Sequence, residues 1–217
     1  MTRIWRFSAV AAAAALLGSG CLLMDERHTW YLDADTGAVV WTVLTQDVRS
    51  DARTAADRDA EELAFWNEVR AENHPAARAF RQLGAGAVRT RALRPLPPFS
   101  IVTEGEFPTL DALGRGLLAE TGLTGTCYLE RDASSSVWTL TLRDPHAEDD
   151  LDSDDDVAAL LSAFDTLRVV LVRGRFESAS GFQLSGDRRV ATISLPEDVD
   201  ENVMVVLQLR WTVDGRP

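Results

Sequence analysis

Alternating apolar and polar positions mark one strand of this chain most clearly. Over residues 203–213, valine, leucine and tryptophan side chains occupy every second position, with mostly polar side chains between them. A period of two residues is typical of a strand with one buried face. Shorter runs bounded by turn residues predict further strands over 29–33, 38–48, 87–93, 99–104, 126–131, 137–143, 169–177, 183–184 and 190–195.

Three regions have the pattern of helices. Residues 54–72 are dense in alanine, glutamate, arginine and leucine and contain no glycine or proline, which favours a helix. After a proline the same pattern resumes over 76–83. Residues 107–119 and 157–164 predict two more helices, the second of them following an acidic stretch that can cap it.

The order of these elements predicts the fold class. Strands come in hairpins separated by single helices, without the long crossovers that a parallel sheet needs. We therefore expect an α+β fold, with a mainly antiparallel sheet and about three helices packed on one face. Residues 29–217 are enough for one well-buried core, so we expect a single domain there.

The first twenty residues have the organisation of a secretory signal peptide. Arg3 and Arg6 are followed by an apolar stretch over 8–17 and by the small residues of 18–20. An apolar stretch of this length is too short to span a bilayer, which requires about 20 residues. Residues 1–20 are therefore predicted to be removed during export.

The end of this leader resembles the lipobox of bacterial lipoproteins. Leu16-Leu17-Gly18-Ser19-Gly20 leads directly into Cys21, although Gly18 stands where an aliphatic residue is commoner. The resemblance implies that Cys21 receives a diacylglyceryl group and becomes a triacylated N-terminus, as a stable anchor. The alternative is ordinary cleavage nearby that leaves Cys21 unmodified.

The residues after the cysteine suggest where the domain would be held. Residues 21–28 would form a lipidated N-terminus and a short tether, which spans at most about 25 Å. In well-studied Gram-negative bacteria, aspartate after the cysteine retains a lipoprotein at the inner membrane, and Leu22 stands there instead. We therefore expect an outer-membrane location facing the periplasm, with inner-membrane location as the alternative.

Charge excludes several function classes. The formal net charge is −12, and it becomes −14 when Arg3 and Arg6 leave with the leader. Such a chain is repelled by nucleic-acid phosphates, so we expect no nucleic-acid partner and membrane contact through the anchor alone. All basic residues are arginine, which excludes Schiff-base lysine chemistry, a P-loop and a Ser-x-x-Lys acyl-enzyme.

Candidate metal ligands are few. Asp150, Asp152 and Asp154 have the first spacings of a calcium loop, but Asp155 replaces the turn glycine and Leu161 replaces the final glutamate. We therefore interpret 144–156 as a solvated acidic loop, with weak calcium binding as the alternative.

Histidine and cysteine also lack the spacing of a metal or redox site. His28, His74 and His146 are far apart in sequence, and we expect each at the surface or in a turn rather than on a metal. Cys127 lies in a predicted strand with no feature that would lower its pKa, so we interpret it as a structural thiol, with a reactive or paired thiol as the alternative. No cofactor is expected.

Carboxylates and tryptophans remain as candidate functional residues. Glu62 falls within the apolar arc of its helix, where it would be either a general acid of raised pKa or a partner of Arg58. Glu104 is a second candidate acid. Tryptophans could line a ligand groove, but Trp138 and Trp211 lie on predicted core faces, which favours core filling.

Three function hypotheses follow, in decreasing order of support. The first is a membrane-anchored bacterial envelope lipoprotein that is not catalytic and binds another envelope protein. The second is a carrier or sensor of an apolar small molecule or lipid, which requires an aromatic-lined pocket of at least about 300 Å³. The third is a cell-wall or glycan hydrolase that uses two carboxylates.

Overall fold

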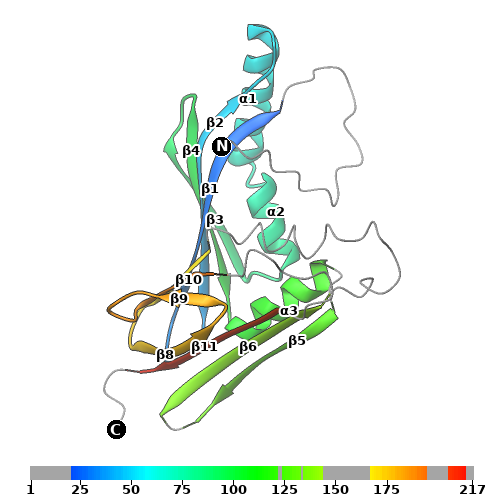
Figure 1. Cartoon of the computed structure of the whole chain (residues 1–217). Helices are drawn as coiled ribbons and strands as arrows, with labels where there is room; N and C mark the ends of the chain where they lie inside the picture. The colour runs from blue at the N-terminus through cyan, green and yellow to red at the C-terminus, as the bar shows by residue number, and fades with distance from the viewer. Residues whose placement is uncertain (1–20, 122–123, 133, 144–166, 195–204, 214–217) are drawn as a thin grey trace.

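Two β-sheets contain most of the secondary structure of the described residues (Figure 1). The computed structural model describes residues 21–121, 124–132, 134–143, 167–194 and 205–213. Within these residues, sheet A has seven strands in the order β3-β4-β2-β1-β7-β10-β9, and sheet B has four in the order β5-β6-β11-β8. Neighbouring strands are antiparallel except for β1 and β7, which pair in parallel.

The strands follow the predicted alternation closely. In sheet A they are β1 (Leu22–Leu32), β2 (Val39–Ser50), β3 (Ala87–Arg94), β4 (Phe99–Phe107), β7 (Arg168–Leu171), β9 (Phe182–Leu184) and β10 (Val190–Ile193). In sheet B they are β5 (Thr124–Arg131), β6 (Ser135–Arg143), β8 (Arg175–Ser180) and β11 (Val205–Thr212).

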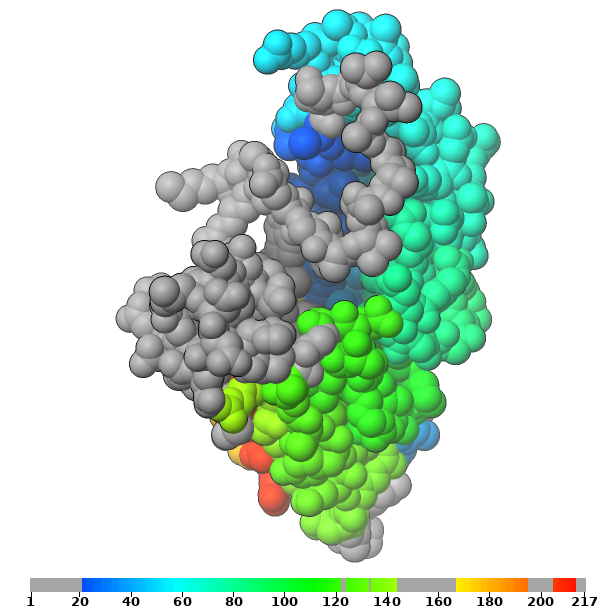
Figure 2. All heavy atoms as spheres, turned by 90° about the vertical axis from the view of Figure 1, so that its right-hand side faces the viewer, coloured from blue at the N-terminus to red at the C-terminus, as the bar shows by residue number. Residues whose placement is uncertain are grey.

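The helices are α1 (Ala55–Arg70), α2 (Pro75–Gln82) and α3 (Leu110–Thr121). Thr54 begins α1, because its hydroxyl accepts a hydrogen bond from the backbone N–H of Asp57 at 3.1 Å. Figure 2 shows the cyan and teal atoms of α1 and α2 alongside the blue atoms of β1, with the green atoms of α3, β5 and β6 below them.

The predicted fold class was wrong, because the described residues are mainly strand and form two sheets rather than one sheet with about three helices on one face. Alternation identifies the buried face of a strand, but it does not show which strands pair. The segment predicted as one strand over 169–177 is interrupted after Leu171, where Gly174 has a φ of +86°. Its two parts then join different sheets. The predicted helix over 157–164 lies outside the described residues.

The main core fills the space between the two sheets and contains tryptophans from both. Trp30 on β1 and Trp138 on β6 contact edge to face, with ring centroids 6.1 Å apart. Trp138 and Trp211 are completely buried, so the prediction that they fill the core is confirmed. Gly114 allows α3 to approach closely, since a Cβ there would lie 2.2 Å from the Cys127 sulfur.

A smaller apolar cluster lies further along sheet A, beneath α1. We call it the α1 cluster, and it consists of Val48, Phe65, Val69, Phe99 and Ile101. Polar side chains separate it from the main core along the same strands. On β1 these are the half-buried Glu26 and the buried His28. The others are buried: Thr45 on β2, Thr103 on β4, and His74 at the start of α2, which packs against Thr103. We call this set the polar belt.

Candidate membrane-attachment site

Cys21 is the residue that immediately precedes β1. Its side chain is exposed. Its backbone N–H donates to Asp51 Oδ1 at 2.5 Å, and its carbonyl accepts from the Asp51 N–H at 3.1 Å. The residues after it are not a loose tether, because β1 begins at Leu22. An acyl group on the Cys21 sulfur would therefore be attached directly next to the first residue of β1, at one end of sheet A.

Carboxylates of α1 hold the end of β2 where Cys21 is fastened. The Glu62 carboxylate accepts the backbone N–H of Ser50 at 3.1 Å, and Glu61 accepts the Ser50 hydroxyl at 2.5 Å. Arg58 donates to the carbonyl of Ala52 at 2.9 Å instead of pairing with Glu62, so that predicted pairing was wrong. These contacts give Glu62 a structural role at the junction of β2 and α1.

The turn between β3 and β4 lies at this same end of sheet A. The register places Leu22 of β1 opposite Ser50 of β2, and Val48 of β2 opposite Phe99 of β4. The turn therefore lies two to three strands from Cys21, a lateral distance on the order of 10–15 Å. Leu96 in the turn is 71 % exposed, the largest exposure among the exposed large apolar side chains.

The sequence around this turn has an unusual charge for an acidic protein. Residues 84–103 contain Arg89, Arg91 and Arg94 and no carboxylate. Arg94 lies 3.6 Å from the Asp47 carboxylate, and both side chains are more than half exposed, so this ion pair adds little stability. The turn thus combines an exposed leucine with nearby arginines.

The second candidate acid, Glu104, does not lie near the first candidate acid, Glu62. It lies half-buried on β4, opposite Thr42 of β2 in the strand register. Glu62 binds Ser50, which is eight residues further along β2, or about 26 Å. The two carboxylates therefore do not form the close pair that glycoside hydrolysis requires.

Cys127 has the environment of a structural thiol, as predicted. It is half-buried, and its sulfur accepts a hydrogen bond from the indole N–H of Trp138 at 3.2 Å. Burial raises the pKa of the thiol to about 11, which keeps it protonated and unreactive at neutral pH.

His28 is buried within β1, so its predicted placement at the surface or in a turn was wrong, whereas His74 lies in the predicted turn, between α1 and α2, with its side chain buried. The Trp41 indole N–H donates to His28 Nδ1 at 3.2 Å, and His74 Nε2 lies 2.9 Å from the Thr90 hydroxyl. Burial lowers the pKa of each imidazole to about 4. The alternation of β1 contained the signal, since His28 shares a face with Trp30.

His146, Asp150, Asp152 and Asp154 lie outside the described residues. In the described ranges, no group of three or more histidine, cysteine, aspartate or glutamate side chains could hold a metal ion.

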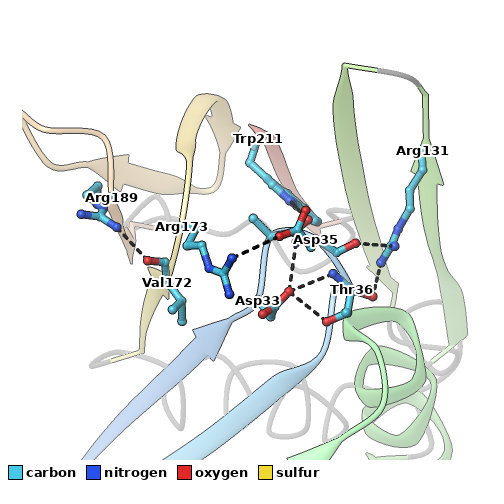
Figure 3. A network of polar contacts seen from close by, with 9 residues as sticks. Asp33, Asp35, Thr36, Arg131, Val172, Arg173, Arg189 and Trp211 are labelled. Atoms are coloured by element: carbon cyan, nitrogen blue, oxygen red, sulfur yellow. Dashed lines mark hydrogen bonds and ion pairs between the residues drawn. The ribbon is translucent and has the colours of Figure 1, made fainter. Parts of the chain in front are cut away.

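The opposite end of β1 carries a polar network that joins the two sheets (Figure 3). The Asp33 carboxylate accepts the Thr36 N–H at 2.9 Å and closes the turn between β1 and β2. Arg131 reaches from sheet B to the carbonyls of Asp35 and Thr36. The Trp211 indole N–H donates to the Ala34 carbonyl at 3.1 Å. We call this region the distal end.

A cavity that sequence reasoning missed lies beside this network. Its volume is about 290 Å³, and it is lined by Gly174, Arg175, Gly186, Asp187, Arg188 and Arg189. This lining is not the aromatic one that an apolar-ligand carrier requires. The available signal was the concentration of four arginines within 173–189 of an acidic chain.

No helix in the described part of the chain is long and apolar enough to cross a membrane. No known family profile matches the sequence, and no curated protein matches it. Among solved structures, the chain is similar to the NMR structure of the folded domain of Mycobacterium tuberculosis LppM. The TM-score is 0.39 and the identity 10 %, over 94 % of this chain and 97 % of that one. A likeness of this size assigns the chain to no family.

Proposed function

We propose that this protein is an exported envelope lipoprotein whose folded domain is held at the membrane by acyl chains on Cys21. The observation that carries the proposal is the position of Cys21, which is exposed and hydrogen-bonded to Asp51 immediately before the first strand of sheet A. The leader and its resemblance to a lipobox supply the chemistry. An N-acylated cysteine keeps its backbone N–H, so the hydrogen bond to Asp51 is compatible with triacylation.

This attachment favours one orientation of the domain on the bilayer. Because the sheet begins directly at the acylated residue, the end that contains Cys21 and the β3–β4 turn would face the lipid. In addition to the anchor, which the net charge alone gave as the only membrane contact, Leu93 and Leu96 would enter the headgroup layer, and the neighbouring arginines would meet lipid phosphates. Leu22 in the second mature position favours the outer membrane, with the domain in the periplasm.

We further propose that the domain is not catalytic and binds another envelope protein. Surfaces that face away from the bilayer, sheet B and the distal end, would be the ones accessible to such a partner. Affinity purification from mild-detergent extracts should recover a partner at defined stoichiometry. Recovery of none under these conditions would contradict this part of the proposal.

The anchor is tested by mass spectrometry of the mature N-terminus and by metabolic labelling with palmitate. We expect a chain that begins at Cys21 and carries acyl groups, and Cys21→Ser should abolish labelling. Cys127→Ser is the matched control and should leave labelling unchanged, since its thiol is half-buried within the fold. A mature chain that begins at Met1, or an unmodified Cys21, would contradict the proposal.

A further inference from the structure

The cavity at the distal end is built from two turns that are held together by their backbones. One turn connects β7 to β8, and the other connects β9 to β10. The Leu171 N–H donates to the Arg189 carbonyl at 2.9 Å, and the Phe176 N–H donates to the Arg188 carbonyl at 2.8 Å. The arginines that line the cavity therefore have a defined backbone position.

The guanidinium groups around this cavity are also oriented. Arg188 Nη1 donates to the Glu177 carbonyl at 2.9 Å, and Arg189 Nη2 donates to the Val172 carbonyl at 2.7 Å (Figure 3 shows the second contact). Each contact uses one of the five N–H donors of a guanidinium group. Within the described residues, the Arg175 side chain has no hydrogen-bond or ion-pair partner.

The one carboxylate in the lining is engaged by its own turn. Asp187 accepts the Ser185 hydroxyl at 2.6 Å and the Arg189 N–H at 3.1 Å. These hydrogen bonds lower the pKa of Asp187, with the contact from Ser185 as the largest cause. The carboxylate therefore stays ionised and attached to the turn, while three arginines of the lining keep donors for a ligand.

The backbone of Arg188 gives a second, independent observation. Its φ is +57°, a conformation in which glycine is favoured and a long side chain costs about 1 kcal/mol. The turn contains a glycine, Gly186, but at a different position. A residue held in an unfavourable conformation at the mouth of a cavity points to a role for its side chain.

We propose that this cavity binds a phosphate group. Guanidinium groups recognise phosphate through paired N–H donors, and three arginines line this cavity in an otherwise acidic protein. The phosphate can belong to a soluble phosphorylated molecule or to a lipid headgroup. The cavity lies at the end of β1 opposite Cys21, across eleven residues of strand or about 36 Å. The inference is independent of the anchor.

Titration of the purified full-length protein in detergent tests the proposal. Inorganic phosphate is the first probe. Its binding is measured by calorimetry or by the chemical shifts of the arginine side chains. We expect saturable binding with a Kd of about 1 mM or tighter. Glycerol phosphate and vesicles containing phosphatidylglycerol then distinguish a soluble ligand from a lipid headgroup. Tighter binding of glycerol phosphate indicates a soluble phosphorylated ligand, and tighter binding of the vesicles indicates a lipid headgroup.

Two variants separate binding from folding. Arg175→Gln should weaken phosphate binding about tenfold. The substitution removes a charged donor that has no hydrogen-bond or ion-pair partner within the described residues. Arg188→Gly should weaken binding similarly while leaving the unfolding midpoint unchanged or higher, since glycine suits the positive φ. Arg70→Gln, exposed on α1, is the control and should bind like the wild type.

Three results would overturn the proposal. They are the absence of saturable phosphate binding, an equal loss of binding in the Arg70→Gln control, or a loss in Arg188→Gly that appears only together with a lower unfolding midpoint. The last result would show that Arg188 stabilises the turn and contributes nothing to a ligand.

Discussion

The main core and the α1 cluster lie on the same face of sheet A, but they differ in what covers them. Sheet B, α2 and α3 enclose the main core, and four of its tryptophans are at most 7 % exposed. The α1 cluster has five buried side chains under one helix, and its neighbours Leu22, Met24 and Trp66 are only partly buried. Since burial of each large side chain stabilises by about 1.5–3 kcal/mol, most of the apolar stabilisation comes from the main core.

This difference separates stability from attachment. The main core determines whether the chain folds, whereas the α1 cluster positions the end that carries Cys21. The polar belt between them interrupts apolar contact along the strands. We therefore expect the α1 region to open locally without unfolding the main core, which native-state hydrogen exchange can detect.

The largest expected effect on the free energy of unfolding comes from removing a large side chain from the main core. Trp138→Ala removes a completely buried indole and its hydrogen bond to Cys127, and should reduce the free energy of unfolding by about 3–5 kcal/mol in urea titration. Phe65→Ala in the α1 cluster is the matched comparison, and should cost about 3 kcal/mol, at the low end of that range, because its site is less enclosed. Equal losses would show that the α1 cluster is as well enclosed as the main core.

Acidification should lower the free energy of unfolding through the two buried histidines of the polar belt. The pKa of His28 and of His74 is about 4 in the folded protein, against 6.5 without burial, so the unfolded chain binds more protons between these values. Stability should therefore be full above pH 6.5 and fall towards pH 4. Glu26, whose pKa burial raises, opposes this change above pH 4.5, because the folded chain then binds the extra proton.

The measurement is urea unfolding at several pH values between 7 and 4.5. His28→Gln should reduce the slope of stability against pH by up to about half, since it removes one of the two buried imidazoles and keeps an acceptor for the Trp41 indole. A slope that is flat in the wild type, or unchanged in the variant, would contradict the burial of His28.

A smaller effect is expected at the start of α1. Thr54→Ala removes the cap that accepts the Asp57 N–H and should cost about 1 kcal/mol. Amide exchange in α1 should accelerate, while exchange in sheet B should not change. Asp59→Ala, exposed on the same helix, should leave both unchanged. Acceleration throughout the molecule would refute the independence of the two regions.

The smallest effect is expected at the β3–β4 turn. Leu96→Ser should change the free energy of unfolding by no more than about 0.5 kcal/mol, because the side chain is 71 % exposed. Thermal unfolding in detergent is the measurement, and Leu63→Ser on α1, 59 % exposed, is the comparison. A clear loss at Leu96 would show that the turn contributes to the α1 cluster.

Sequence patterns predicted most strands and the course of α1, because local periodicity determines which face of an element is buried. They did not predict two sheets, because pairing depends on long-range contacts such as β1 with β7. Cys21 was recognisable from a contiguous motif. The arginine-lined cavity was not, because its residues come from two turns that meet only when β10 pairs with β7.

The hydrogen bond from Trp211 to the Ala34 carbonyl joins positions 177 residues apart in the chain. The β1–β2 turn that contains Ala34 is synthesised early, but its carbonyl has no Trp211 donor until position 211 has emerged. Contacts of such separation slow folding. A nascent chain of this protein consequently cannot complete its native packing until nearly the whole chain has been synthesised.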